Sequence, residues 1–221
     1  MVYAGLPGIY ESEGFDREHL DLPDQHTALI TAVCAANPNT VVVLANGAPV
    51  TMPWLDQVPA VLEGYLGGQA SGSGIADVLM GVQNPAGKLA ETFPLSLEDV
   101  PCTPFFPGEN RQMQYREGIY VGYRYYDTAR RNVLFPFGHG LSYTEFEYVE
   151  ANTDNASLTA DSRITLHVTL KNTGNRAGAE IIQVYRHTRN SATHQPEQQL
   201  CGFAKVLLQS AQTATVTITL A

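Results

Sequence analysis

Tyr10-Glu11-Ser12-Glu13-Gly14-Phe15-Asp16-Arg17 follows directly on a short apolar run, Val2 to Leu6, and is closed by Leu20-Asp21-Leu22-Pro23. The apolar run predicts a buried strand that ends at Gly5-Leu6-Pro7-Gly8. In open α/β sheets, the loop that leaves the carboxyl end of a strand projects side chains from a rigid scaffold. The stretch therefore predicts an α/β fold with a functional loop beside its sheet.

The loop places three carboxylates and one guanidinium within seven residues. Arg17 can pair with Asp16 or Glu11, which leaves one carboxyl group free to keep a raised pKa, as a proton donor needs. Gly14 lets the backbone turn sharply beside Glu13. The alternative is a solvated acidic turn that Arg17 merely neutralises.

Strand and helix patterns alternate up to about Pro94, which predicts a mostly parallel sheet covered by helices. The expected elements are a helix over 24–36 capped by Asp24, a buried strand over 40–45, an apolar strand over 58–66 and a helix over 75–80. The glycine-rich segment 67–74 lacks the Gly-Lys-Ser/Thr of a phosphate loop, so its glycines indicate close packing of helix on sheet. Trp54, the sole tryptophan, is either a core anchor or a platform for a sugar ring.

Prolines, glycines and aromatic residues replace the periodic pattern between Leu95 and Leu134, which predicts a long irregular connection. Its tyrosines either hold domains together or line a sugar site; they are Tyr115, Tyr120, Tyr123, Tyr125 and Tyr126. His139, between two glycines, is expected to be a hydrogen-bonded structural residue rather than a catalytic one.

The period changes to two after Tyr143. Alternating apolar and polar residues over 164–171 and 213–220, with a turn at 172–175, indicate short antiparallel strands of a β-sandwich. About six strands can be counted where such a sandwich needs seven. We therefore expect an open edge in place of the last strand, or a neighbouring chain paired with it.

Composition excludes several classes of protein. The net charge is −9 from 13 basic and 22 acidic residues, and the basic residues are scattered, so nucleic acid is not an expected partner. No apolar run approaches the roughly 18 residues of a membrane span, and no export signal is present, so we expect no membrane association and a cytoplasmic location. Cys34, Cys102 and Cys201 lack metal-ligand spacing and are expected to be buried, reduced thiols.

Three further stretches stand in a fixed order with the loop. They are Gly87-Lys88-Leu89-Ala90-Glu91-Thr92-Phe93-Pro94, Tyr115-Arg116-Glu117-Gly118-Ile119-Tyr120-Val121-Gly122-Tyr123-Arg124-Tyr125-Tyr126 and Phe135-Pro136-Phe137-Gly138-His139-Gly140-Leu141-Ser142-Tyr143. Together with the loop they resemble the C-terminal part of glycoside hydrolase family 3, the bacterial β-glucosidase type.

The resemblance implies a fold and its divisions. Residues 1–94 would be the C-terminal portion of an α/β three-layer sandwich with the acid/base loop, 95–142 a connecting segment, and 143–221 a fibronectin type III-like β-sandwich lacking its last strand. In this family a (β/α)8 barrel and the first half of the α/β domain precede this point. The chain starts where a sheet should already be under way, as expected for a truncated product or for strands carried on another polypeptide.

The resemblance also implies site residues. Glu13 matches the family's general acid/base, with Glu11 as runner-up, since residues two apart in an extended segment point the same way. Asp16 and Arg17 would support it. The family's nucleophile is an aspartate followed by tryptophan on the barrel, whereas Pro53 precedes the only tryptophan here. We therefore expect no nucleophile in this chain, and no glycoside hydrolysis without an added barrel.

The implied substrate is a β-glucoside or short oligosaccharide, with a barrel domain or another copy of the chain as the protein partner. The family needs no metal or organic cofactor, and six histidines and three cysteines without ligand spacing favour no metal site. The competing hypothesis is a non-catalytic carbohydrate-binding or assembly module derived from such an enzyme.

Overall fold

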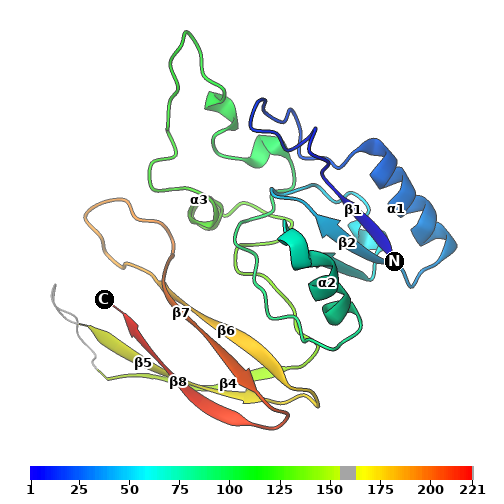
Figure 1. Cartoon of the computed structure of the whole chain (residues 1–221). Coiled ribbons are helices and arrows are strands. Elements are labelled where there is room, and N and C mark those ends of the chain that lie inside the picture. The colour runs from blue at the N-terminus through cyan, green and yellow to red at the C-terminus, as the bar shows by residue number, and fades with distance from the viewer. Residues whose placement is uncertain (155–162, 221) are drawn as a thin grey trace. The chain divides into compact units, whose positions relative to one another are not determined.

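A computed structural model describes residues 1–154 and 163–220, and the chain forms two compact units. The first unit comprises Met1–Leu79, Glu91–Gly118 and Asn132–Pro136. The second comprises Met80–Ala90, Ile119–Arg131 and Phe137–Ala221. Each unit is therefore assembled from three separate segments of the chain (Figure 1).

The first unit is built on a three-stranded parallel sheet in the order β1-β2-β3. The strands are β1 (Val2–Gly5), β2 (Val41–Ala45) and β3 (Ala60–Glu63). Val42, Val43 and Leu44 are completely buried in the central strand, as a continuous apolar run in a parallel sheet predicts. The α/β class and the parallel sheet are thus confirmed.

Helix α1 (Asp24–Ala36) contacts β1 and has the bounds that the sequence predicts. It buries Ile30 and Cys34 and ends where the Asn37 N–H donates to the carbonyl of Val33 at 2.8 Å. The predicted cap is wrong: Asp24 is the first helical residue, Pro23 precedes it, and no side chain caps the helix start. Proline at that position already fixes an extended backbone, so the helix starts without a side-chain acceptor.

Helix α2 (Ser71–Leu79) begins four residues before the predicted start and includes part of the glycine-rich segment. A 3₁₀ turn, η2 (Gly68–Ala70), leads directly into it. Gly64 lies against Ile75 of this helix, since a Cβ at Gly64 would come within 3.1 Å of the Ile75 Cδ1 atom. Gly64 thus allows close packing of helix on strand. For the glycines of 67–74 the predicted packing role is wrong, because a Cβ at Gly68, Gly72 or Gly74 would have nothing within 4 Å and one at Gly67 would meet Ser71 of the same segment.

The predicted irregular connection contains more structure than expected. Besides the short 3₁₀ turns η3 (Leu97–Asp99) and η4 (Thr103–Phe105), this segment forms α3 (Tyr123–Ala129). A further 3₁₀ turn, η1 (Leu55–Gln57), lies earlier in the chain, before β3. Helix α3 was missed because two turns are too short to show a 3.6-residue period and three of its residues are tyrosines. Arg130 in the left-handed conformation ends it.

The second unit contains the antiparallel strands (Figure 1). One sheet has the order β4-β5-β8, from β4 (Phe146–Thr153), β5 (Ile164–Asn172) and β8 (Thr213–Leu220); the other pairs β6 (Gly178–Arg186) with β7 (Gln199–Leu208). Their inward residues share one core, formed by Val168, Leu170, Ile182, Leu208 and Ile218. The alternating pattern thus marked the inner faces correctly, and a two-sheet β-structure of the fibronectin type III-like kind is confirmed.

The described residues after Tyr143 form five strands, where the sequence predicted about six. Residues 155–162 lie outside the described part of the chain. Within that part, β8 is the edge strand of its sheet: it pairs with β5 on one side and with no described strand on the other. All three cysteines are free: Cys34 is buried as expected, Cys102 is partly buried, and Cys201 is exposed, contrary to the prediction. Among the described helices, none combines the length and the apolar character needed to cross a membrane.

Candidate functional site

The loop that follows β1 starts with a tight turn. The backbone N–H groups of Tyr10 and Glu11 both donate to the carbonyl oxygen of Pro7, at 2.7 and 3.3 Å. The Leu6 N–H donates to the Ala45 carbonyl at 3.0 Å, which extends the pairing of β1 with β2 by one residue. The chain therefore leaves the sheet at the carboxyl end of β1, the edge where α/β proteins place functional loops.

The start of this loop contacts its end, and the end is held by Thr51. The rings of Tyr10 and His19 meet edge to face with centroids 6.3 Å apart. The Thr51 N–H donates to the carbonyl of Leu20 at 2.9 Å, and the Thr51 hydroxyl donates to the carboxylate of Asp21. Residues 10–21 therefore form a closed loop of defined shape.

Two side chains of the loop are fixed on the turn that follows β2. Glu11 Oε1 accepts a hydrogen bond from the backbone N–H of Gly47 at 2.7 Å. Arg17 Nη1 donates to the carbonyl oxygen of Pro49 at 3.4 Å. The segment between Glu11 and Arg17, which contains Glu13, is therefore held at both ends by one turn, residues 46–49.

Gly47 makes this arrangement possible. A Cβ at this position would lie 3.2 Å from Glu11 Oε1 and 2.9 Å from Leu66 Cδ1. The absence of a side chain lets the carboxylate reach the backbone N–H directly.

The structure places the predicted proton donor at the surface. Glu13 and Asp16 are exposed, and within residues 1–154 and 163–220 no hydrogen bond or ion pair holds the Glu13 carboxyl group. A weak hydrogen bond from the Gly14 N–H to Ser12 Oγ, at 3.4 Å, shapes the backbone on either side of it. The carboxyl group of Glu13 is thus exposed to solvent, whereas the carboxylate of Glu11 is hydrogen-bonded to the backbone of Gly47.

Arg17 does not form the ion pair that the sequence suggested. Among the described residues its guanidinium lies within ion-pair distance of neither Asp16 nor Glu11, and its Nε and Nη2 atoms are buried without a hydrogen-bond partner. Burial lowers the pKa of Arg17, while the negative charges of Glu11 and Asp21 oppose that effect. Arg17 therefore acts as a partly buried anchor of the loop.

Sequence reasoning missed Glu63, the last residue of β3. Its carboxylate accepts hydrogen bonds from the Tyr65 N–H at 2.8 Å and from Asn46 Nδ2 at 3.2 Å. Burial raises the pKa of Glu63 to about 7; the two hydrogen bonds lower it in part, and the charges of Glu91 and Glu11 raise it further. This is the group whose pKa is moved most strongly toward neutrality in the first unit.

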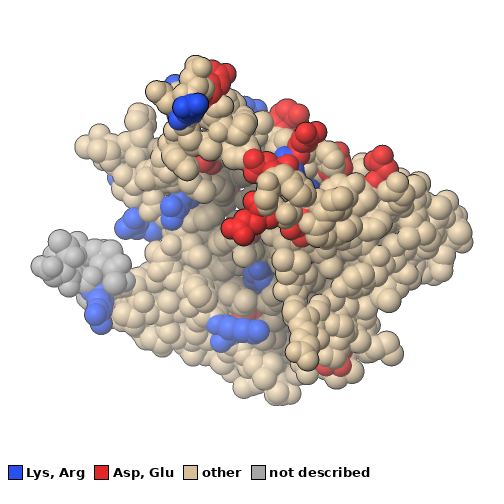
Figure 2. All heavy atoms as spheres, turned by 45° about the horizontal axis from the view of Figure 1, so that its top comes forward, with Lys and Arg blue, Asp and Glu red and all other residues tan. Residues whose placement is uncertain are grey.

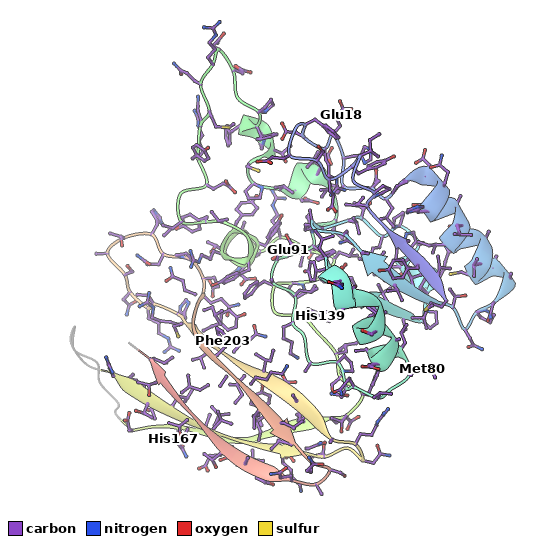
Figure 3. The ribbon with its side chains drawn as sticks, viewed as in Figure 1. Glu18, Met80, Glu91, His139, His167 and Phe203 are labelled. Carbon is purple, nitrogen blue, oxygen red and sulfur yellow. The ribbon has the colours of Figure 1, made fainter. Side chains whose placement is uncertain are left out.

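Glu91 completes a group of three carboxylates at this end of the sheet. Burial, together with the charge of Glu11, raises the pKa of Glu91. Figure 3 labels Glu91 below the loop and Glu18 at its outer edge, and Figure 2 shows acidic side chains gathered in one area of the face in view. Glu11, Glu63 and Glu91 come from three separate segments, so only the fold brings their charges together.

One signal could have pointed to Glu63. It is the one charged residue within the apolar strand predicted over 58–66. The observed strand β3 ends at Glu63, at the same edge of the sheet as the loop after β1. Glu91 lies in the stretch 87–94 used for the family resemblance, but nothing in its neighbours indicates burial.

The tyrosines divide between exposed and structural positions. Tyr115 in the first unit is 85% exposed. Tyr123 in α3 stacks on Phe137 with centroids 4.7 Å apart, and its hydroxyl accepts a hydrogen bond from the Leu200 N–H at 2.7 Å. Tyr126 is buried. Tyr123 and Tyr126 are therefore packing residues of the second unit, whereas Tyr115 is open to solvent.

Packing decides the roles of His139 and Trp54. The backbone of His139 pairs with Leu89, whose N–H donates to the His139 carbonyl at 2.8 Å, and burial with the nearby charge of Lys88 lowers the pKa of the imidazole. Trp54 is 1% exposed and belongs to the core. Within residues 1–154 and 163–220, no three His, Cys, Asp or Glu side chains lie together in a group that could hold a metal ion.

Two family models match this chain. The Glycosyl hydrolase family 3 C-terminal domain matches residues 1–143, and the Fibronectin type III-like domain matches residues 180–221. Among similar proteins, thermostable β-glucosidase B of Acetivibrio thermocellus is 53% identical over 220 residues, covering 100% of this chain and 29% of its own length. Probable β-glucosidase I of Aspergillus terreus is 45% identical over 223 residues, covering 99% of this chain and 27% of its own.

Solved structures agree with these matches. The β-glucosidase from Kluyveromyces marxianus superposes with a TM-score of 0.91 at 44% identity, covering 99% of this chain and 26% of the neighbour. The GH3 β-glucosidase of Bifidobacterium adolescentis gives a TM-score of 0.93 at 42% identity, covering 99% and 32%. The chain thus spans between a quarter and a third of the length of these relatives.

Proposed function

Because the chain belongs to glycosyl hydrolase family 3 and corresponds to its C-terminal domain, we propose that it supplies the proton donor for retaining hydrolysis of β-glucosides, with Glu13 as that donor. The observation that carries this proposal is the geometry of the loop. Glu13 stands exposed between Glu11 and Arg17, both of which are fixed on the turn 46–49. A donor needs this combination of an accessible carboxyl group on a constrained backbone.

Retaining hydrolysis needs two carboxyl groups about 5 Å apart. In the first step the protonated Glu13 gives its proton to the glycosidic oxygen as the second carboxylate attacks the anomeric carbon. In the second step the ionised Glu13 removes a proton from water, which then displaces that carboxylate from the sugar.

The contacts of Glu11 favour Glu13 over the runner-up. The Glu11 carboxylate accepts a hydrogen bond from the backbone N–H of Gly47 at 2.7 Å. This side chain is therefore already engaged as an anchor of the loop and is not free to approach a glycosidic oxygen. Glu13 has no such bond among the described residues.

The nucleophile would come from outside these 221 residues. The relatives named above are three to four times longer than the matched region, and no aspartate here precedes tryptophan. We propose that the second carboxylate stands on a (β/α)8 barrel, carried by a longer polypeptide or by a separate chain. The 221 residues alone would then bind no glycoside productively.

An assay with aryl β-glucosides tests this proposal. The chain alone should give no turnover, and an assembly that includes the barrel should hydrolyse the substrate. In that assembly Glu13→Gln should lower kcat by about 10²–10⁴ for substrates with a poor leaving group. For a dinitrophenyl glucoside, whose departure needs no proton, kcat/KM should fall much less, while kcat stays low because the second step still lacks its base. Added azide, which attacks without losing a proton, should then restore kcat.

The matched variant Glu11→Gln is the control for the choice of donor. It should lower activity without the dependence on leaving group and without rescue by azide. The reverse pattern, with azide rescue at Glu11 and none at Glu13, would assign the donor to Glu11. Sustained turnover by the 221-residue chain alone would refute the need for a barrel.

A further inference from the structure

The position of Glu13 depends on a turn whose contacts with the loop span 32 and 36 residues of the chain. Glu11 and Arg17 bracket Glu13, and their partners are the Gly47 N–H and the Pro49 carbonyl. Because the carboxyl group of Glu13 itself is not held by any described residue, its location follows the backbone of residues 46–49. Any residue that fixes that turn therefore also fixes the loop.

Asn46 is the residue that fixes the turn. It is completely buried, and its Nδ2 donates to the carbonyl of Ala48 at 3.0 Å, which closes the turn on itself. The same Nδ2 donates to Glu63 Oε2 at 3.2 Å. One side-chain amide thus joins the turn after β2 to the end of β3.

Glu63 is in turn held from the other side. Its Oε1 accepts the N–H of Tyr65 at 2.8 Å, and Leu44 lies directly opposite it in the β2–β3 ladder. The carboxyl group is therefore fixed by its own strand end, and it offers a defined acceptor to Asn46. A half-buried carboxyl group that accepts two hydrogen bonds is a rigid support rather than a solvated side chain.

We infer that Asn46 and Glu63 are positioning residues for the proton-donor loop: Glu63 orients the Asn46 amide, Asn46 shapes the turn 46–49, and that turn holds Glu11 and Arg17. This inference rests on the proposed role of Glu13 for its catalytic meaning, but the mechanical link stands on hydrogen bonds within one unit. The hydrogen bonds of Asn46 and Glu63 go to Ala48, to Tyr65 and to each other, and not to Glu13, so both residues act through the backbone.

Isosteric variants separate this role from simple packing. Asn46→Asp keeps the shape of the side chain but replaces its donating NH₂ group with an oxygen atom. The Ala48 carbonyl and the Glu63 carboxylate would both repel this oxygen. Glu63→Gln keeps one acceptor oxygen, and Glu63→Leu removes both. Asn39→Asp is the matched control, because Asn39 is an exposed asparagine before β2.

The first measurement needs no activity. Amide hydrogen exchange of Gly47 in the 221-residue chain reports the bond to Glu11. We expect Asn46→Asp and Glu63→Leu to accelerate exchange at Gly47 by about tenfold or more, with Glu63→Gln between them and the wild type. The amides of β2, which pair within the sheet, serve as the internal reference, and Asn39→Asp should leave Gly47 unchanged.

The second measurement uses the barrel-containing assembly. Asn46→Asp should lower kcat/KM for a substrate with a poor leaving group by about tenfold, while kcat/KM with a dinitrophenyl glucoside, whose departure needs no proton, stays close to wild type. Glu63→Gln should recover most of the activity that Glu63→Leu loses.

The outcomes distinguish the two hypotheses. Unchanged exchange at Gly47 in Asn46→Asp, in a protein that melts like the wild type, overturns the positioning role whatever Glu13 does. Faster exchange at Gly47 combined with full activity of Glu13→Gln would leave the mechanical link standing and refute the role of Glu13 instead. If Asn46→Asp does not fold, the contrast of Glu63→Gln with Glu63→Leu gives the same decision.

Discussion

Lys88 Nζ lies 3.2 Å from Glu180 Oε1, and it also donates to the carbonyl of Gly140 at 2.8 Å. Both side chains of the ion pair are largely buried, at 16% and 13% exposure. Burial, reinforced by the charge of Glu180 and its hydrogen bond, raises the pKa of Tyr148 to about 12. The carboxylate of Glu180 in β6 thus contacts Lys88 of the segment 80–90 and Tyr148 of β4, and so connects these two parts of the second unit.

Replacing Lys88 should destabilise the second unit. Lys88→Met leaves the Glu180 carboxylate partly buried and without its cation, which costs about 2 kcal/mol of unfolding free energy. Urea denaturation followed by circular dichroism measures this. The exposed lysine variant Lys205→Met is the control and should change stability by less than about 0.5 kcal/mol. Equal effects of the two variants would contradict a structural role for the ion pair.

Glu63 should make stability depend on pH. Burial raises its pKa in the folded chain from 4.5 to about 7, so the folded state keeps a proton that the unfolded chain releases in this range. Its contribution is fully present below pH 4.5 and is lost as the pH rises through about 7, on the order of 3 kcal/mol in total. Denaturation at pH 4.5 and pH 8 should show a smaller difference for Glu63→Gln than for wild type.

The exposed variant Glu18→Gln provides the comparison for that experiment. It should preserve the wild-type difference between the two pH values. A Glu63→Gln protein with the full wild-type difference would assign the pH dependence to other groups.

Trp54 should tolerate phenylalanine better than alanine. The side chain is 1% exposed, and its Nε1 is buried without a hydrogen-bond partner among the described residues. Trp54→Ala should cost about 3–5 kcal/mol through lost burial and a cavity. Trp54→Phe removes the unpaired donor while keeping an aromatic ring, so it should cost only about 1–2 kcal/mol. Denaturation followed by far-ultraviolet circular dichroism checks both, and equal costs would contradict the stabilising role of an aromatic ring at this position.

Gly5 should not accept a side chain. A Cβ at Gly5 would overlap the backbone carbonyl of Ala45, its neighbour in the β1–β2 ladder, and backbone of a central strand cannot move aside. Gly5→Ala should lower stability by more than about 3 kcal/mol or prevent folding. Gly8→Ala is the matched control, because nothing lies within 4 Å of a Cβ there. Comparable melting temperatures for the two variants would contradict the close approach.

The sequence predicted those parts of the fold that show a strong period. The buried strand at 41–45, helix α1 and the alternating strands after Tyr143 follow from patterns that extend over five residues or more. Helix α3 lacked such a pattern, and the cap of α1 was wrong because Pro23 already fixed the backbone before it. Local sequence patterns therefore predicted an element correctly where the tertiary packing favours the same structure.

The candidate site was predictable only in its local part. Glu11, Glu13, Asp16 and Arg17 stand in one stretch, so their chemistry could be read from the loop. The bonds from Glu11 to Gly47 and from Asn46 to Glu63 cross 36 and 17 residues, and no spacing rule predicts them. Burial, which decides the pKa of Glu63, depends on the same long-range packing.

The segmented make-up of the two units limits how this polypeptide can be divided. A fragment that begins at residue 143 would lack Lys88, the partner of Glu180, and Gly81, whose carbonyl accepts a hydrogen bond from Arg176 at 2.5 Å. A fragment that ends at residue 94 would lack Phe135, whose backbone pairs with Phe93. Cutting the chain at either point would therefore expose surfaces that are normally covered. Limited proteolysis should degrade both units and should not release one of them as an intact fragment.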